Sequence, residues 1–141
     1  MSDITIKEVS AKKDFREFLM FPYSLFKDDK MWVPPLITDE KTTFNKKKNP
    51  AFEFCDADYF LAYRDGKVVG RVAAIINHNA NRTWDCKVVR FGWLDFVDDA
   101  DVLKALLSEV EKRGAGRGCD TMKGTLGFTA VYYTHMTVPP K

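Results

Sequence analysis

Residues 58–77 read DYFLAYRDGKVVGRVAAIIN, and this stretch decides the fold. Two runs rich in β-forming residues, 58–63 and 67–77, flank the pair Asp65-Gly66. Asp-Gly between two such runs is a strong signal for a β-hairpin, because both residues tolerate the positive φ angles of a two-residue turn. The second run is apolar on both faces over 72–76, as expected of a central strand that is covered on two sides. The sequence therefore predicts a hairpin at the centre of a sheet.

On the N-terminal side of the hairpin, the pattern predicts a short strand and two helices. The strand covers residues 4–9, and Ser10 is the expected N-cap of the first helix. Apolar residues at three- and four-residue intervals place one face of this helix in the core: Phe15, Phe18, Leu19, Tyr23 and Phe26. Pro22 interrupts that face, so we expect a kink or a new helix start there. Pro34 or Pro35 opens the second helix.

On the C-terminal side, the pattern predicts a helical turn at 80–84, a strand at 88–97 and then a longer helix. The apolar stripe of the longer helix is Val102, Leu103, Leu106, Leu107 and Val110. The glycine-rich segment 114–118 follows this helix, where carbonyl groups rather than free amides are presented. We therefore interpret it as a helix C-cap and not as a phosphate-binding loop. One more short strand covers residues 119–123.

The order of these elements predicts an α+β domain with a mixed, mostly antiparallel sheet flanked by helices. We expect the domain to span residues 1–129. The remainder, 130–141, is interpreted as a tail whose segment 131–138 has strand-forming residues.

The bulk composition excludes several classes of protein. The 141 residues carry a net charge of +2, with 45% hydrophobic and 30% charged residues, which is ordinary for a globular domain. No apolar stretch approaches the ~20 residues of a membrane helix, and the first residues lack the pattern of a signal peptide. We therefore expect a cytoplasmic protein without a membrane partner. The charge is too close to neutral to predict a nucleic-acid partner.

Three polar features remain to be placed. Cys55, Cys86 and Cys119 lack the spacing of a disulfide framework or a zinc site, so we expect reduced thiols and no metal. His78 follows a buried strand and is either a titratable residue lining a cleft or, as we favour, a hydrogen-bonded loop residue. The lysines at 46–48 are interpreted as a solvated loop, with contact to an acidic partner as the alternative.

Five sequence motifs occur in an order that resembles a known superfamily. They are FPY at 21–23 with WVPPL at 32–36, NPAFEF at 49–54, DGKVVGRVAAI at 65–75, VRFGW at 89–93 and GTLGF at 124–128. Together they resemble a bacterial branch of the GNAT (Gcn5-related N-acetyltransferase) superfamily. The resemblance covers residues 4–129 and corresponds to the N-terminal portion of that fold, so we expect a fold that is truncated after the fifth strand.

The resemblance implies an acyl-CoA between the fourth and fifth strands, with acetyl-CoA or another acyl-CoA as donor. The end of the fourth strand and the start of the next helix would hold it, which maps to Phe96, Val97, Asp98, Asp99, Ala100, Asp101 and Val102. Some members of the family place a general base near the end of the fourth strand, and Asp95 occupies that position. The alternative interpretation of Asp95 is a solvated acid at a strand end without a catalytic role.

One departure from the family pattern concerns the diphosphate of the donor. The family has a glycine-rich loop with a basic residue where this chain has Asp98-Asp99-Ala100-Asp101. Carboxylates at this position cap the helix amides and repel an anion. Two functions follow as hypotheses. The chain is either an N-acyltransferase acting on a small-molecule amine, or a non-catalytic binding module that forms a homodimer through an uncovered sheet edge.

Overall fold

The predicted hairpin is present at the centre of the fold. A computed structural model of the chain describes residues 3–124. Strands β2 (Cys55–Arg64) and β3 (Lys67–Asn77) pair in antiparallel register. The turn between them has φ 53° at Asp65 and 77° at Gly66, which are the two positive angles of a type I′ turn. The prediction from Asp-Gly is therefore confirmed.

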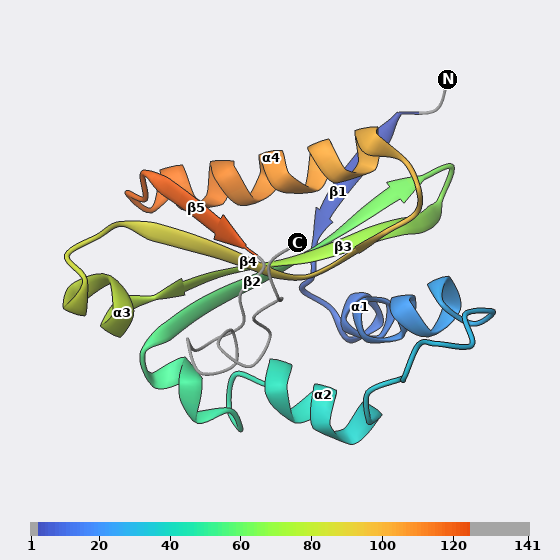
Figure 1. The fold of residues 1–141 in the computed structure, drawn as a ribbon, viewed down its shortest axis with the longest axis horizontal. Coiled ribbons are helices and arrows are strands. Elements are labelled where there is room, and N and C mark those ends of the chain that lie inside the picture. Colours follow the sequence, from blue (N-terminus) through green and yellow to red (C-terminus); the bar gives the residue numbers. More distant parts are fainter. Residues whose placement is uncertain (1–2, 125–141) are drawn as a thin grey trace.

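Five strands form one sheet in the order β1-β2-β3-β4-β5 (Figure 1). The outer strands are β1 (Ile4–Glu8) and β5 (Thr121–Gly124), and β4 (Val88–Phe96) lies beside β3. Neighbours are antiparallel except β4 and β5, which are parallel. The α+β class and the mostly antiparallel sheet are confirmed. The predicted strand at 131–138 lies outside the described residues.

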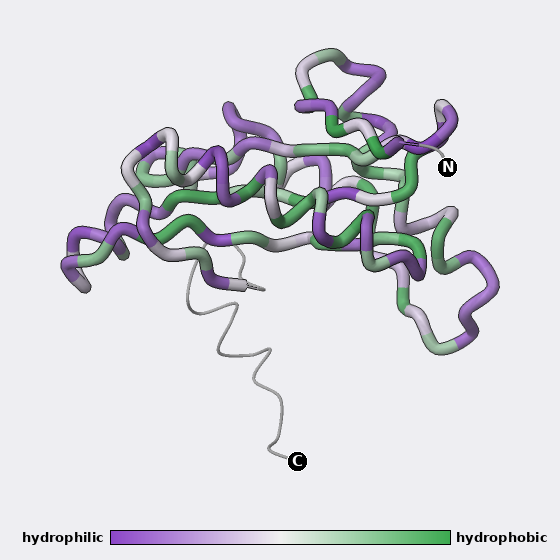
Figure 2. Tube along the Cα trace, turned by 90° about the horizontal axis from the view of Figure 1, so that it is seen from above, coloured by the Kyte–Doolittle hydropathy of each residue, from purple (hydrophilic) through white to green (hydrophobic). Residues whose placement is uncertain are grey.

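Helices cover both faces of the sheet (Figure 1). Helix α4 (Ala100–Gly116) packs on one face, and α1 (Lys12–Leu25) with α2 (Ile37–Phe44) packs on the other. A 3-10 turn, η1 (Pro50–Glu53), and a short helix, α3 (His78–Thr83), complete the set. Hydrophobic residues follow the central strands, whereas the loops at the ends are mostly hydrophilic (Figure 2). None of the helices in the described part of the chain is long and apolar enough to cross a bilayer.

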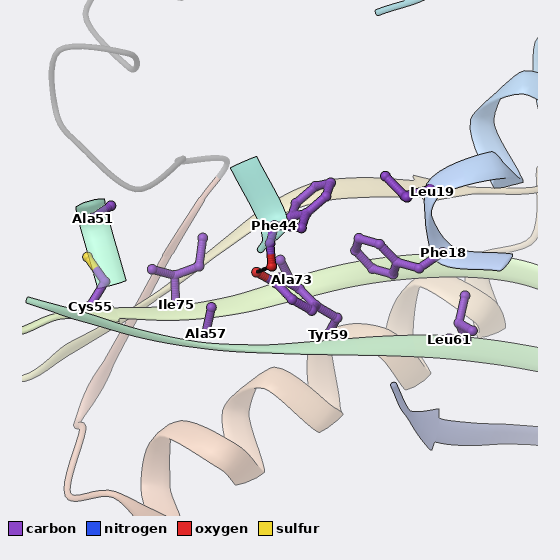
Figure 3. Close-up of a cluster of buried hydrophobic side chains, with 10 residues drawn as sticks. All are labelled: Phe18, Leu19, Phe44, Ala51, Cys55, Ala57, Tyr59, Leu61, Ala73 and Ile75. Atoms are coloured by element: carbon purple, nitrogen blue, oxygen red, sulfur yellow. Dashed lines mark hydrogen bonds between the residues drawn. The ribbon is translucent and has the colours of Figure 1, made fainter. Parts of the chain in front are cut away.

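The core on the α1/α2 side is centred on Phe44, the last residue of α2 (Figure 3). Its side chain is 2% exposed. Its ring lies 5.3 Å from that of Phe18, 5.1 Å from Tyr59 and 4.9 Å from Trp93, all in edge-on geometry. Such contacts add to the free energy of burial. The prediction that Phe18 belongs to the core is confirmed.

Helix α1 does not restart at Pro22, contrary to one of the two expected outcomes. The helix continues to Leu25, and the Phe26 amide donates to the Pro22 carbonyl at 2.9 Å. A proline has no amide hydrogen to offer the carbonyl four residues earlier, which belongs to Phe18. A side chain from the sheet replaces the missing donor, because Arg71 Nη1 donates to the Phe18 oxygen at 2.8 Å. This compensation lets the helix run through the proline.

The N-terminus of α1 is capped differently from the prediction. The N-cap is Ala11 rather than Ser10. The buried carboxylate of Asp14 accepts hydrogen bonds from the amides of Ser10 at 3.3 Å and Ala11 at 3.1 Å, and it lies 2.8 Å from Lys7 Nζ. The contact with Lys7, followed by those with the two amides, lowers the pKa of Asp14 to about 2. The side chain of Asp14, inside the helix, therefore accepts the hydrogen bonds at the start of the helix that were expected to go to Ser10.

Replacing Asp14 with asparagine is expected to destabilise the protein at neutral pH, with the difference vanishing in acid. The folded-state pKa lies below the ordinary 3.8, so the stabilisation by the carboxylate is complete above that value. It is lost as the pH falls from 3.8 towards 2. Urea unfolding of both proteins from pH 7 to pH 2 measures this, with exposed Asp28→Asn as control. A gap that stays constant with pH would contradict the assignment.

Helix α4 ends in a Schellman motif, which confirms the prediction of a helix C-cap. Gly118 has φ 85°, the Cys119 amide donates to the Gly114 carbonyl at 2.8 Å, and the Gly118 amide donates to Ala115 at 3.1 Å. Gly114 and Gly116 belong to the helix, which ends at Gly116. Of the three glycines in this segment, only Gly118 has the left-handed conformation.

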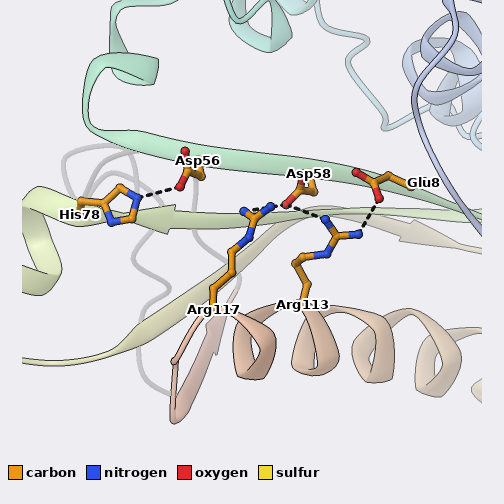
Figure 4. Close-up of polar contacts among 6 residues, drawn as sticks. All are labelled: Glu8, Asp56, Asp58, His78, Arg113 and Arg117. Atoms are coloured by element: carbon orange, nitrogen blue, oxygen red, sulfur yellow. Dashed lines mark hydrogen bonds and ion pairs between the residues drawn. The ribbon is translucent and has the colours of Figure 1, made fainter.

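Ion pairs link the C-terminal half of α4 to β1 and β2 (Figure 4). The buried carboxylate of Asp58 lies 2.9 Å from Arg117 and 3.5 Å from Arg113. Arg113 also donates to Glu8 at 2.5 Å. These contacts fix how α4 lies across the sheet.

Replacing Gly114 with alanine is expected to destabilise the protein by about 1–3 kcal/mol through overpacking. An added Cβ would lie 2.5 Å from Val89 Cγ1, so α4 would have to move away from β4. Gly116→Ala is the matched control, because a Cβ there meets open space. That variant should gain up to about 1 kcal/mol from helix propensity. Equal effects of the two substitutions in urea unfolding would refute the close packing.

Candidate functional site

Asp95 lies near the end of β4, directly after a β-bulge. Arg71 of β3 pairs with Asp95 and Ala73 pairs with Gly92, so two residues of β4 stand opposite one of β3. Within the bulge, Trp93 has φ 48°, an uncommon angle for a bulky side chain. Bulges re-aim side chains and recur beside active sites. The bulge therefore sets the position of Asp95 relative to the sheet.

Arg71 is the partner of Asp95 and lies almost completely inside the protein. Its side chain is 4% exposed, and its Nε lies 2.9 Å from Asp95 Oδ2. Nη1 donates to the Phe18 carbonyl that Pro22 leaves without a helical donor, and the guanidinium lies 5.0 Å from the centre of the Phe18 ring. Burial lowers the pKa of Arg71, and the ion pair with Asp95 opposes that shift. The group remains a cation, because arginine does not deprotonate in proteins.

Two further residues interact electrostatically with this pair. Burial raises the pKa of Glu40 from α2, an effect that Arg71 opposes and Asp95 reinforces. Burial also raises the pKa of Tyr23 from α1, and Glu40 adds to that shift. The Tyr23 hydroxyl donates to the Pro35 carbonyl. We call these four residues, Tyr23, Glu40, Arg71 and Asp95, the Arg71 cluster.

The Arg71 cluster gathers side chains from α1, α2, β3 and β4 on the same face of the sheet. Sequence reasoning named Asp95 but missed Arg71 and Glu40 as site residues, and it assigned Tyr23 to core packing. One signal was available, since Arg71 is a charge next to the apolar run at 72–76. Groups with perturbed pKa values gathered in this way are typical of catalytic sites. The arrangement offers two carboxylates for proton transfer and a buried cation that holds one of them in place.

The residues predicted to hold an acyl-CoA lie together at the end of β4 and the start of α4. Phe96 pairs with Gly70, and the Val97 amide donates to the Val69 carbonyl at 3.0 Å. Residues 98 and 99 connect the strand to the helix, and residues 100–102 form the first turn of α4. The predicted segment is thus continuous with Asp95.

The first turn of α4 is already capped by the chain itself. Asp99 Oδ1 accepts from the Asp101 amide at 2.9 Å, and the Asp99 carbonyl accepts from the Val102 amide at 3.1 Å. Asp99 also forms an ion pair with Arg64, which, together with the Asp101 amide, lowers the pKa of Asp99. A diphosphate does not fit this helix start, because two amides have acceptors and three carboxylates are clustered there.

The other sequence candidates lie away from the Arg71 cluster. His78 is the first residue of α3 and not a loop residue. Its Nε2 lies 2.8 Å from Asp56 Oδ2, and both side chains are about half exposed (Figure 4). Helix α3 thus begins two residues earlier than predicted, because the Asn77 side chain caps it. The lysines at 46–48 are exposed, in agreement with a solvated loop. The three cysteines are thiols.

Two curated proteins are similar to this chain in sequence. Protein YghO from Escherichia coli (strain K12) is 31% identical over 113 residues, covering 80% of this chain and 29% of that protein. Bacterial ceramide synthase from Caulobacter vibrioides (strain NA1000 / CB15N) is 27% identical over 118 residues, covering 83% of this chain and 31% of that protein. The chain therefore spans less than a third of the length of either relative. No family model matches the sequence.

Solved structures resemble the fold at low sequence identity. A tandem GNAT protein from the clavulanic acid biosynthesis pathway superposes with a TM-score of 0.63 at 15% identity, covering 85% of this chain and 35% of that chain. The structure of AAC(6')-Iy with the bisubstrate analogue CoA-S-monomethyl-acetylneamine has a TM-score of 0.61 at 17% identity, covering 96% and 87%. These structural similarities establish the architecture. The sequence identities are too low to infer a substrate for this chain.

Proposed function

We propose that this chain, which has the fold of the GNAT acetyltransferases, carries an N-acyltransferase site that moves an acyl group from an acyl thioester to an amine. The observation that carries the proposal is the Arg71 cluster. A bulged strand presents Asp95 to a buried guanidinium at the end of β4, and Glu40 adds a second carboxylate. One of the two sequence relatives supports this chemistry, since it is a bacterial ceramide synthase and a ceramide is an amide of an amino alcohol.

Asp95 is the proposed general base. The nitrogen of the acceptor amine attacks the thioester carbon, a C–N bond forms and the C–S bond breaks. Asp95 accepts the proton that the amine loses, directly or through a water molecule, and the departing thiolate takes up a proton from solvent. Arg71 holds the Asp95 carboxylate at 2.9 Å and is a positioning residue. Glu40 is a second candidate for the base, because it is a carboxylate that interacts electrostatically with both Arg71 and Asp95, and burial raises its pKa.

The donor is proposed to bind mainly through its thioester and pantetheine end. Residues 95–97 provide a strand end beside the base, whereas the capped start of α4 does not offer a diphosphate free amides. Removing the nucleotide part of the donor should therefore cost little affinity. This expectation separates the chain from proteins that anchor the donor at a glycine-rich helix start.

Isothermal titration tests the donor site directly. The chain is titrated with acetyl-CoA, coenzyme A and S-acetyl-pantetheine, and circular dichroism verifies that it is folded. We expect acetyl-CoA and S-acetyl-pantetheine to bind within a few-fold of each other. The absence of heat with every thioester at millimolar concentration would refute the enzymatic proposal. If acetyl-CoA bound much more tightly than S-acetyl-pantetheine, the protein would have to bind the diphosphate as well.

A non-catalytic assembly role is the second candidate. Among the described strands, β5 lies at an edge of the sheet, and three of its four residues are exposed. Exposed strand edges pair with other chains unless they are protected. A homodimer through this edge would be seen as a doubled mass in light scattering. A monomer at the highest soluble concentration would contradict it.

A further inference from the structure

Arg90 is a second buried arginine, and nothing in the proposed reaction uses it. It lies near the start of β4, pairs with Ile75 of β3, and is 9% exposed. Asp95 and the start of α4 are at the opposite end of the same strand. The residue is part of the motif VRFGW at 89–93. It therefore marks a region distinct from the Arg71 cluster.

The guanidinium of Arg90 differs from that of Arg71 in its partners. Its Nη1 atom is inaccessible to solvent and has no hydrogen-bond partner among residues 3–124. Burial lowers the pKa of Arg90, and the electrostatic interaction with Cys55 and Cys86 opposes that shift. A buried cation without a carboxylate or carbonyl acceptor costs free energy, and native proteins rarely keep one without a reason.

Arg90 lines an open cleft of about 680 Å³ between α3, β4 and β5. A second cation, Lys123, also lines this cleft and is the register partner of Arg90 across the parallel pair. Apolar side chains complete its wall, among them Phe91, Met122 and the 77%-exposed indole of Trp84. We call this cavity the Arg90 cleft.

The wall of the Arg90 cleft is held in a fixed shape by hydrogen bonds. The Asn81 side chain donates to the Val88 carbonyl at 3.1 Å and accepts from the Val88 amide at 3.4 Å, which ties α3 to β4. The Cys86 thiol also donates to Asn81 at 3.6 Å.

We propose that the Arg90 cleft is a binding site for an organic anion, with Arg90 and Lys123 holding a phosphate or carboxylate group and Trp84 covering the apolar part of the molecule. Arginine recognises both anions through paired N–H donors. The site is independent of the acyl-transfer proposal, because it lies at the other end of β4.

Titration calorimetry with three probes tests this site: inorganic phosphate, octyl phosphate and octanoate. We expect octyl phosphate or octanoate to bind more tightly than inorganic phosphate, because only these reach the apolar wall. The better of the two identifies the preferred anion. Arg90→Met should weaken binding by about tenfold to a hundredfold, as expected for lost charge-assisted hydrogen bonds. Arg90→Lys should retain part of the affinity.

A second measurement separates binding from a structural role. Because Arg90 Nη1 has no hydrogen-bond acceptor within the described part of the chain, Arg90→Met should unfold at the same temperature as the wild type or higher without ligand. Only the wild type should then gain stability when the probe is added. Lys67→Met, at the hairpin turn, is the control and should bind like the wild type. Failure of all three probes to bind at millimolar concentration, or equal binding by Arg90→Met, would overturn the proposal.

Discussion

Replacing Asp95 with asparagine is expected to lower kcat/KM for N-acyl transfer by about 10²–10⁴-fold, the usual contribution of a positioned general base. Asparagine has nearly the shape of aspartate and can still accept a hydrogen bond from Arg71, whose Nε lies 2.9 Å from the carboxylate. It cannot accept the proton of the attacking amine. The loss should therefore fall on kcat, with thioester binding in calorimetry changed only a few-fold.

Two further variants are needed to interpret the effect of Asp95→Asn on kcat/KM. Glu40→Gln removes the other carboxylate of the Arg71 cluster, and a larger loss for it than for Asp95→Asn would move the role of base to Glu40. Asp56→Asn is the matched control, because Asp56 is exposed and contacts His78 far from the cluster. Unchanged kcat in Asp95→Asn, with activity demonstrated in the wild type, would leave Asp95 with a structural role only.

Replacing Phe44 with alanine is expected to lower the free energy of unfolding by about 3–5 kcal/mol. The ring is 2% exposed and contacts the rings of Phe18, Tyr59 and Trp93, which come from three other elements of the fold. Removing it leaves a cavity between α2 and the sheet that the rigid strands cannot fill. Urea unfolding followed by circular dichroism measures the change.

The control for Phe44 is a ring outside this cluster. Phe26 is half-buried and packs on Trp32 of the connector between α1 and α2, at 5.3 Å between centroids. Phe26→Ala should cost clearly less than Phe44→Ala. If the two variants lost equal stability, the core on this face would not be centred on α2.

The parts of the fold that follow from local chemistry could be predicted from the sequence. Asp65-Gly66 specified the hairpin because the turn type depends on two neighbouring residues. The apolar stripe of α4 predicted its buried face, and the glycine-rich segment 114–118 predicted its C-terminal cap. The class of the sheet followed from these elements, and the resemblance to GNAT proteins agreed with the fold that the structure has.

The contacts that follow from long-range register could not be predicted. Whether Asp95 meets Arg71 depends on the bulge at Trp93, which shifts the pairing of two strands by one residue. The predicted N-cap of α1 was wrong, because Asp14 and not Ser10 accepts the hydrogen bonds of the free amides. The acidic segment 98–101 is evident from the sequence, but the amide to which Asp99 binds depends on the geometry of the strand end and the helix start.

Pro22 has a consequence that reaches beyond its own helix. Because it lacks an amide hydrogen, the Phe18 carbonyl is open to Arg71, whose hydrogen bond to it is 2.8 Å long. Any other residue at position 22 would bring a competing donor. The two positions are therefore thermodynamically coupled, and the effects of substituting both should be non-additive. In evolutionary terms, a change at the proline alters the background in which changes at Arg71 are tolerated, although the two residues belong to different layers of the domain.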